Sequence, residues 1–179
     1  MARRARRANL CEPDGLAYCS LRNGIIASMQ PVHQTSDRTM AEARLGPNRL
    51  AGAYAWKSLS AAGATLAFGS DAPVEAPDPF AGIAAAISRQ GPDSEPFGGW
   101  QAQERVSFDA ALAAYTSGAA YAGLAESRFG RIAPGMRADF LLVDRDPTLS
   151  SPGEIRQTRV LEAWVGGRKA WAAPQPVNR

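Results

Sequence analysis

The sequence predicts an α/β fold in which parallel strands and helices are followed by a small antiparallel sheet. Two short apolar runs, residues 24–29 and 64–71, each lead into polar residues, and helical patterns follow both of them. This alternation is typical of parallel α/β units, whose strands are buried on both faces. After residue 131 the pattern changes to short strands separated by turn residues, which indicates antiparallel pairing.

The first predicted strand, residues 24–29, is apolar and ends at a polar stretch. Residues 31–37 carry His33, the only histidine of the chain, and we expect them to form a loop. A helix is predicted over residues 48–62, because apolar side chains recur at helical spacing there. Gly63 stands where a glycine commonly follows the end of a helix.

The second predicted strand, residues 64–71, ends in the carboxylate of Asp71. Asp78 is expected to cap the next helix, with Pro79 in its first turn. One face of that helix is apolar and contains Phe80, Ile83, Ala84 and Ile87. Ser107 is expected to cap a further helix that runs to about residue 124.

The C-terminal part predicts a hairpin. Residues 138–143 are expected to form one strand, and residues 160–165 and 168–171 to form two more. The last two flank Gly166-Gly167, a two-residue turn signal. These strands form the predicted antiparallel sheet.

The composition is that of an ordinary globular protein. The chain has 179 residues, of which 45% are hydrophobic and 21% charged, and this length can bury a core. No apolar stretch reaches the ~20 residues that a membrane-spanning helix needs, and two cysteines are too few for a disulfide scaffold. We therefore expect a cytoplasmic protein that has no membrane partner.

The positive charge is concentrated at one end. The net charge is +3, but four of the 20 basic residues are Arg3, Arg4, Arg6 and Arg7, and the remaining 16 stand against 17 acidic residues. No later stretch interleaves basic and aromatic residues, as a groove for single-stranded nucleic acid would. The sequence therefore predicts an irregular basic arm over residues 1–23 and does not favour nucleic acid as a partner.

Asp71 and His33 are the candidate chemical groups. A carboxylate at the C-terminal end of a parallel strand lies where α/β barrels form their active sites, and it can bind a metal or accept a proton. The alternative is that Asp71 only begins a turn. His33 follows the neighbouring predicted strand and lies at the same rim, or else it is an ordinary surface or hydrogen-bonding histidine.

Several motifs occur in an order that resembles one known family. Residues 28–33 read Ser-Met-Gln-Pro-Val-His, residues 68–75 read Phe-Gly-Ser-Asp-Ala-Pro-Val-Glu, and residues 130–140 contain Gly-Arg-Ile-Ala-Pro-Gly and then Ala-Asp-Phe. This order resembles the C-terminal third of an amidohydrolase-3-type protein of the metal-dependent amidohydrolase superfamily, a group that includes N-substituted formamide deformylases. The resemblance covers about residues 24–171.

The resemblance implies a fold and a division of the chain. Residues 24–128 would be part of a TIM-type (β/α)8 barrel, namely its last two strands and their helices. Residues 129–173 would be a small antiparallel segment of a composite β-sandwich domain, and residues 174–179 a frayed tail.

The resemblance also implies a chemistry. Asp71 matches the aspartate that binds metal and accepts the proton of the attacking water, and we give His33 a substrate-binding role. The implied cofactor is a divalent metal, with zinc the expected ion, and the implied substrate is a small molecule with an amide-type carbon–nitrogen bond. Such a metal makes hydroxide available near neutral pH and polarises the carbonyl.

The sequence departs from this family pattern before residue 24. No histidine precedes His33, and Arg7 falls where the family carries a ligand histidine, although a guanidinium cannot replace a neutral imidazole. We therefore expect a truncated C-terminal segment that neither retains metal nor hydrolyses substrate alone. Two alternatives stay open: a non-catalytic scaffold with an arginine-rich arm, and one half of a split enzyme that pairs with an N-terminal half or with itself.

Overall fold

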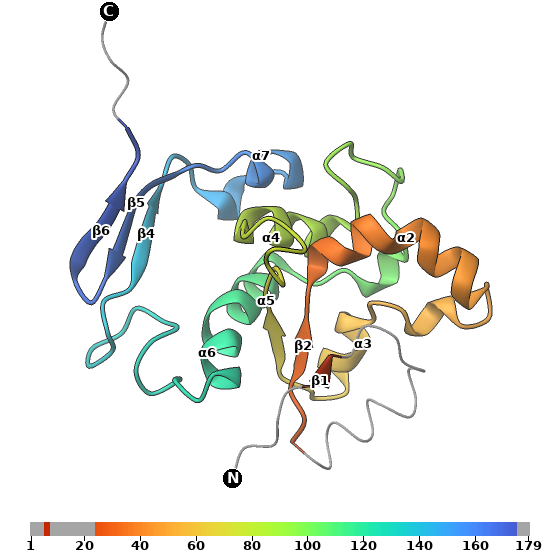
Figure 1. Cartoon of the computed structure of the whole chain (residues 1–179), viewed down its shortest axis with the longest axis horizontal. Helices are drawn as coiled ribbons and strands as arrows, with labels where there is room; N and C mark the ends of the chain where they lie inside the picture. Colours follow the sequence, from red (N-terminus) through yellow and green to blue (C-terminus); the bar gives the residue numbers. More distant parts are fainter. Residues whose placement is uncertain (1–5, 8–23, 175–179) are drawn as a thin grey trace, which may run out of the picture.

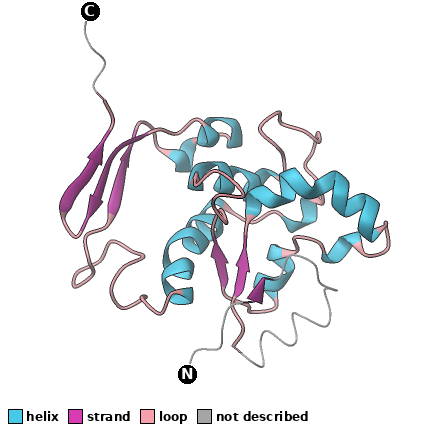
Figure 2. Ribbon diagram, viewed as in Figure 1, coloured by secondary structure: helices cyan, strands magenta, loops and turns pink. Residues whose placement is uncertain are grey.

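The computed structural model describes residues 6–7 and 24–174. It contains two separate three-stranded sheets, one parallel and one antiparallel. The parallel strands lie among the helices, and the antiparallel sheet lies at one side of the molecule (Figures 1 and 2). The α/β class and the change to antiparallel strands are therefore confirmed.

The parallel sheet has the order β1–β2–β3. Its strands are β1 (Arg6–Arg7), β2 (Ala27–Met29) and β3 (Leu66–Phe68). All three residues of β3 are buried, as expected for a strand covered on both faces. Strand β1 lies within the segment for which the sequence predicts irregular structure, and the rest of that segment, residues 1–5 and 8–23, lies outside the described residues.

The predicted loop at residues 31–37 is wrong, because these residues begin helix α2 (Pro31–Leu45). Proline suits the first position of a helix, where its missing N–H would have no partner. The face that α2 buries includes the polar residues His33 and Gln34. These side chains conceal the apolar spacing by which a helix is recognised in a sequence.

The single helix predicted at residues 48–62 is also wrong. A 3-10 turn, η1 (Leu50–Gly52), is followed by the short helix α3 (Trp56–Ala61). Between them Tyr54 has φ = 55°, in the left-handed region that interrupts a right-handed helix.

The next helices confirm their predicted starts. Helix α4 (Pro79–Ser88) is capped by Asp78, whose carboxylate accepts from the Phe80 N–H at 2.9 Å. Ser107 caps α5 (Phe108–Ala113), after the 3-10 turn η2 (Ala102–Glu104). Helix α5 continues through a π-helical turn, η3 (Ala114–Gly118), into α6 (Ala119–Ala122), so the helical stretch ends close to the predicted residue 124.

The core lies between the parallel sheet and its helices. Trp56 and Met29 are completely buried, and the Trp56 ring meets Phe68 edge-on with centroids 6.0 Å apart. The π-helical turn lies directly on β3, because Gly118 has no Cβ that would overlap the Leu66 carbonyl oxygen.

The antiparallel sheet has the order β4–β5–β6. Its strands are β4 (Phe140–Val143), β5 (Val160–Val165) and β6 (Arg168–Ala172), and Gly166-Gly167 joins the last two as predicted. A 3-10 turn, η4 (Pro147–Leu149), and helix α7 (Pro152–Arg156) connect β4 to β5. Helix α7 packs on α4 and buries Ile155.

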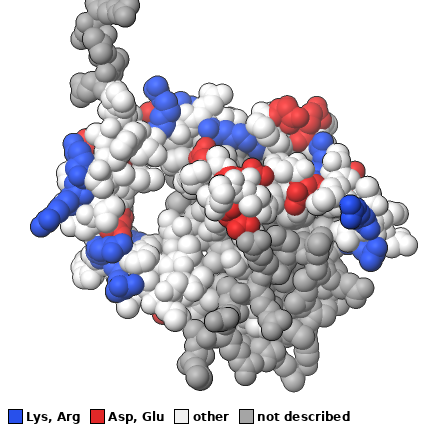
Figure 3. Space-filling model, in the orientation of Figure 1, with Lys and Arg blue, Asp and Glu red and all other residues white. Residues whose placement is uncertain are grey.

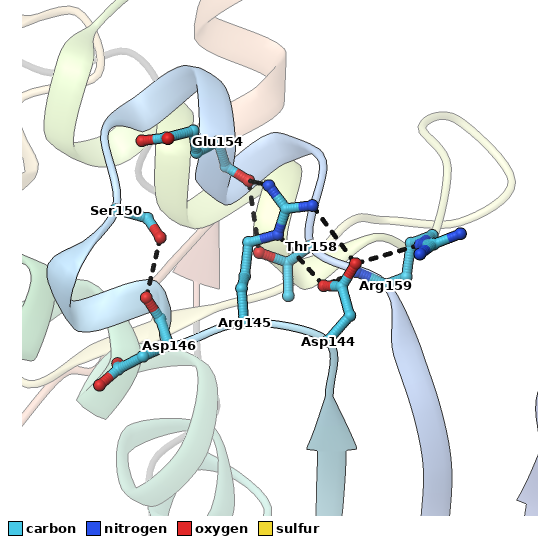
Figure 4. A network of polar contacts seen from close by, with 7 residues as sticks. All are labelled: Asp144, Arg145, Asp146, Ser150, Glu154, Thr158 and Arg159. Atoms are coloured by element: carbon cyan, nitrogen blue, oxygen red, sulfur yellow. Dashed lines mark hydrogen bonds and ion pairs between the residues drawn. The ribbon is translucent and has the colours of Figure 1, made fainter.

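An ion-pair network fixes the junction between this sheet and α7 (Figure 4). The Asp144 carboxylate accepts from Nε of Arg145 at 3.2 Å and from Nε of Arg159 at 3.1 Å, and Arg145 also donates to the Glu154 carbonyl. The hydrogen bond from Arg145 contributes most to holding the pKa of Asp144 well below its usual range. The network is structural, since it lies at the junction and not at the edge of the parallel sheet.

Candidate active site

The candidate site lies at the C-terminal edge of the parallel sheet, where β2 leads into α2 and β3 leads into a turn. Strands β2 and β3 pair in parallel, and the Gly69 N–H donates to the Met29 carbonyl at 3.2 Å, so the two chains leave the sheet side by side. Ligands and catalytic groups of α/β folds gather at this edge. His33 and Asp71 follow these two neighbouring strands.

His33 lies in the first turn of α2 and is 8% exposed. Its Nε2 atom is buried and has no hydrogen-bond partner among the described residues. Its backbone N–H donates to the Gln30 carbonyl at 3.1 Å, which closes the first turn of α2 directly after β2. A buried imidazole nitrogen without a partner is a site at which a ligand atom or a water can bind.

Asp71 lies in the turn after β3 and is partly exposed. It has φ = 59°, and its carbonyl accepts from the Val74 N–H at 2.9 Å. Asp71 therefore does begin a turn, and this turn leaves its residue at the same sheet edge as His33. Residues other than glycine seldom adopt the left-handed conformation, and those that do cluster at functional sites.

Two hydrogen bonds beside these residues were not foreseen from the sequence. Ser36 in α2 donates to Oε1 of Glu75 at 2.6 Å, and the Tyr54 hydroxyl donates to Oδ2 of Asp37 at 2.6 Å. The signal that could have found Ser36 and Asp37 is their spacing of three and four residues from His33, which places all three on one helical face. That spacing has no meaning while residues 31–37 are interpreted as a loop.

The completely buried guanidinium of Arg89 contacts the backbone of Tyr54. Its Nη1 donates to the Tyr54 carbonyl at 2.9 Å, its Nε donates to the Trp100 carbonyl at 2.8 Å, and its Cζ lies 4.1 Å from the Trp56 ring centroid. Burial lowers the pKa of Arg89 to about 9, against the opposing effect of Glu104. Arg89 thus fixes the segment that carries Tyr54.

The described residues do not complete a metal site. A zinc centre takes at least three protein ligands, and no group of three His, Cys, Asp or Glu residues in residues 24–174 could hold a metal ion. Asp71 and His33 provide one carboxylate and one imidazole. The donor types suit zinc, but the set is incomplete, and no reaction step through a metal follows from the described residues alone.

Comparison with known proteins identifies the family. A family model described as "Amidohydrolase family" (Amidohydro_3) matches residues 20–170. The chain belongs to the amidohydrolase family. The resemblance seen in the sequence motifs is therefore confirmed.

The chain is much shorter than the relatives that it matches. It is 32% identical over 144 residues to the amidohydrolase YtcJ of Bacillus subtilis (strain 168), a match that spans 80% of this chain and 27% of YtcJ. It is 33% identical over 111 residues to the N-substituted formamide deformylase of Arthrobacter pascens, spanning 62% of this chain and 20% of the deformylase. The chain thus spans about a quarter of the length of these relatives.

A solved structure agrees with this assignment. The crystal structure of a metal-dependent hydrolase from Pyrococcus horikoshii OT3 superimposes with a TM-score of 0.72 at 30% identity, covering 82% of this chain and 29% of that one. The chain therefore shares most of its fold with part of a metal-dependent hydrolase.

The surface and the helices bear on the predicted partners. On the face in Figure 3, Lys and Arg side chains and Asp and Glu side chains each occur in several separate groups. No helix within the described part of the chain is both long and apolar enough to cross a membrane.

Proposed function

We propose that this amidohydrolase is the C-terminal portion of a metal-dependent enzyme that hydrolyses non-peptide carbon–nitrogen bonds of amide, N-formyl or N-acyl type. The observation that carries the proposal is the position of Asp71 and His33 after two adjacent parallel strands. The similarity to an N-substituted formamide deformylase supports the substrate class. Residues 24–128 would then be the end of a TIM-type barrel, and residues 129–173 part of a β-sandwich domain.

In this proposal Asp71 has two functions and His33 has one. In the complete site the Asp71 carboxylate would hold the metal and accept the proton of the attacking water, and the buried His33 imidazole would bind the substrate. Zinc, when bound, supplies a Lewis acid that polarises the amide carbonyl. Because the described residues offer too few ligands, we propose that the chain alone neither retains metal nor turns over substrate.

A split enzyme is the second candidate. It is supported by the incomplete ligand set and by the parallel sheet, in which β1 and β3 each pair on one side within the described residues. A second polypeptide would supply the remaining strands and ligands. The non-catalytic scaffold remains the alternative if no such partner restores activity.

Complementation tests these proposals. The chain is co-expressed with the part of the Arthrobacter pascens deformylase that it does not match, and amine release from N-substituted formamides is measured with added zinc. We expect hydrolysis by the complex and none by either part alone. Asp71→Asn should lower the rate at least ~100-fold, because it removes the base and keeps the shape. His33→Ala should raise KM more than it lowers kcat.

Asp109→Asn is the matched control, since Asp109 is an exposed aspartate in the first turn of α5. It should leave the rate unchanged. An active complex that Asp71→Asn does not affect would contradict the function of Asp71. A folded complex without hydrolysis, combined with salt-sensitive polyanion retention by the arginine-rich arm, would favour the scaffold.

A further inference from the structure

Four side chains that the proposed reaction does not use connect the segments around the candidate site. We propose that the hydrogen bonds Ser36–Glu75 and Asp37–Tyr54 form a two-point clamp on α2 that positions His33 against the Asp71 turn. We call these two bonds the α2 clamp. The proposal rests on the proposed function, because it assigns positioning residues to that same site.

The clamp acts on the helical face that carries His33. Ser36 and Asp37 follow His33 by three and four residues within α2, and residues at these spacings are neighbours on a helix. A force on either side chain therefore acts on the turn of helix next to the imidazole. The two hydrogen bonds therefore add tertiary contacts to the N-terminal half of α2.

One point of the clamp is anchored in the core. Tyr54 is only 3% exposed and lies in the left-handed region, yet its hydroxyl reaches Asp37 at 2.6 Å. A tyrosine keeps this conformation only if its surroundings hold it. Arg89 provides that support, because its Nη1 donates to the Tyr54 carbonyl while its guanidinium stacks on the buried Trp56.

The other point joins the two segments that carry the candidate residues. Ser36 belongs to the helix after β2, and Glu75 belongs to the segment after β3, four residues beyond Asp71. The Ser36–Glu75 bond at 2.6 Å therefore spans the sheet edge. With the Asp37–Tyr54 bond it prevents α2 from rolling about its axis, which would move His33 relative to Asp71.

The sole histidine makes the clamp measurable without metal or substrate. The full chain is prepared with 13C-labelled histidine, so its Cε1–Hε1 correlation reports His33 alone. Hydrogen exchange of the α2 amides is measured on the same samples. Tyr54→Phe and Ser36→Ala should each move or split the His33 signal and increase exchange in the first two turns of α2 at least tenfold.

Conservative replacement separates positioning from a general loss of structure. Ser36→Thr keeps the hydroxyl and should restore the single His33 signal, whereas Ser36→Ala should not. Tyr121→Phe is the control for Tyr54→Phe, because Tyr121 is 46% exposed on α6, and it should leave the His33 signal in place. If Tyr54→Phe unfolds the chain, the Ser36 pair of variants decides the outcome, since Ser36 is exposed.

The two proposals can fail separately. An unmoved His33 signal in folded Ser36→Ala and Tyr54→Phe overturns the clamp, whatever the complex hydrolyses. A moved signal together with an inactive complemented complex sustains the clamp and contradicts the proposed function. In an active complex, Ser36→Ala should raise KM more than it lowers kcat, the pattern of a displaced substrate-binding residue.

Discussion

Tyr115 shows how a single buried hydroxyl can weaken a protein. Its Oη atom is buried against Gly82 of α4 and has no hydrogen-bond partner among the described residues. Burial, followed by the charge of Asp78, raises the pKa of Tyr115 above its ordinary value of 10. A buried hydroxyl without a partner costs ~1–3 kcal/mol of stability. The Tyr115 hydroxyl therefore offsets part of the stability that burial of the ring contributes.

We therefore predict that Tyr115→Phe leaves stability at pH 7 unchanged or increases it. Above pH 10 the unfolded chain loses the Tyr115 proton that the folded chain keeps, so the wild type should lose about 1.4 kcal/mol relative to the variant per pH unit. Urea unfolding at pH 8, 10 and 11 measures this difference. The stability difference between the wild type and Tyr121→Phe, a variant at an exposed tyrosine, should stay constant over this range. A pH-dependent loss of stability that is equal in Tyr115→Phe and Tyr121→Phe would contradict the prediction.

Gly118 is a position at which no other residue fits. A Cβ there would overlap the Leu66 carbonyl oxygen of β3, and a backbone atom cannot move aside as a flexible side chain can. We predict that Gly118→Ala lowers the free energy of unfolding by ~1–3 kcal/mol. Gly153→Ala in α7 has open space around it and should be neutral or stabilising, so equal effects in urea titrations would refute the argument.

At the scale of elements, helix α7 is the connection between the antiparallel sheet and the helices. Its Ile155 is 1% exposed and packs in the main core, whereas Leu149 in the preceding turn is 87% exposed. We predict that Ile155→Ala costs ~2–5 kcal/mol, through lost burial and the cavity that remains. Leu149→Ala removes a side chain of the same size and should cost less than ~0.5 kcal/mol, as measured by chemical denaturation.

The elements that the sequence predicts correctly are those in which local signals agree with the tertiary environment. Helix α4 has a capping aspartate, a proline in its first turn and an apolar face, and each signal favours the same start. Helix α2 could not be predicted in this way, because it buries His33 and Gln34. The break at Tyr54 depends on Arg89, which is 35 residues away in the sequence, so no local pattern contains it.

At the scale of the whole molecule, the candidate site is predictable only in part. Asp71 and His33 follow from strand ends and motif order, because parallel strands place their C-terminal ends at one edge. The α2 clamp is not predictable, since its partners Tyr54 and Glu75 lie 17 and 39 residues from Asp37 and Ser36. The pairing of these residues depends on how α2 packs, and the hydrophobic pattern of the sequence does not predict α2.

The incomplete ligand set leads to a prediction about metal content. We expect the purified chain to retain less than one equivalent of zinc after dialysis, because Asp71 and His33 are fewer than the three ligands that zinc requires. Elemental analysis measures the content. One tightly held zinc per chain that is lost in Asp71→Ala would contradict this prediction and show that other donors complete the site.

The antiparallel sheet leads to a prediction about association. Residues directly opposite in antiparallel strands share a face, and Leu141, Ala163 and Trp171 form such a row across all three strands. Leu141 and Trp171 are 45% and 49% exposed. Strands β4 and β6 are both edges of this sheet, and exposed apolar edges and faces promote pairing between chains.

We therefore expect the isolated chain to associate with itself as its concentration rises. Trp171→Lys places a charge at the β6 end of the apolar row and should shift sedimentation at a given concentration toward the monomer. Arg168→Lys, on the same strand, keeps the charge and should leave association unchanged. A wild-type chain that sediments as a monomer throughout the micromolar range would contradict this prediction. Stable interfaces bury well over 1,000 Å² of surface, so that result would mean that the exposed row is too small to hold two chains together.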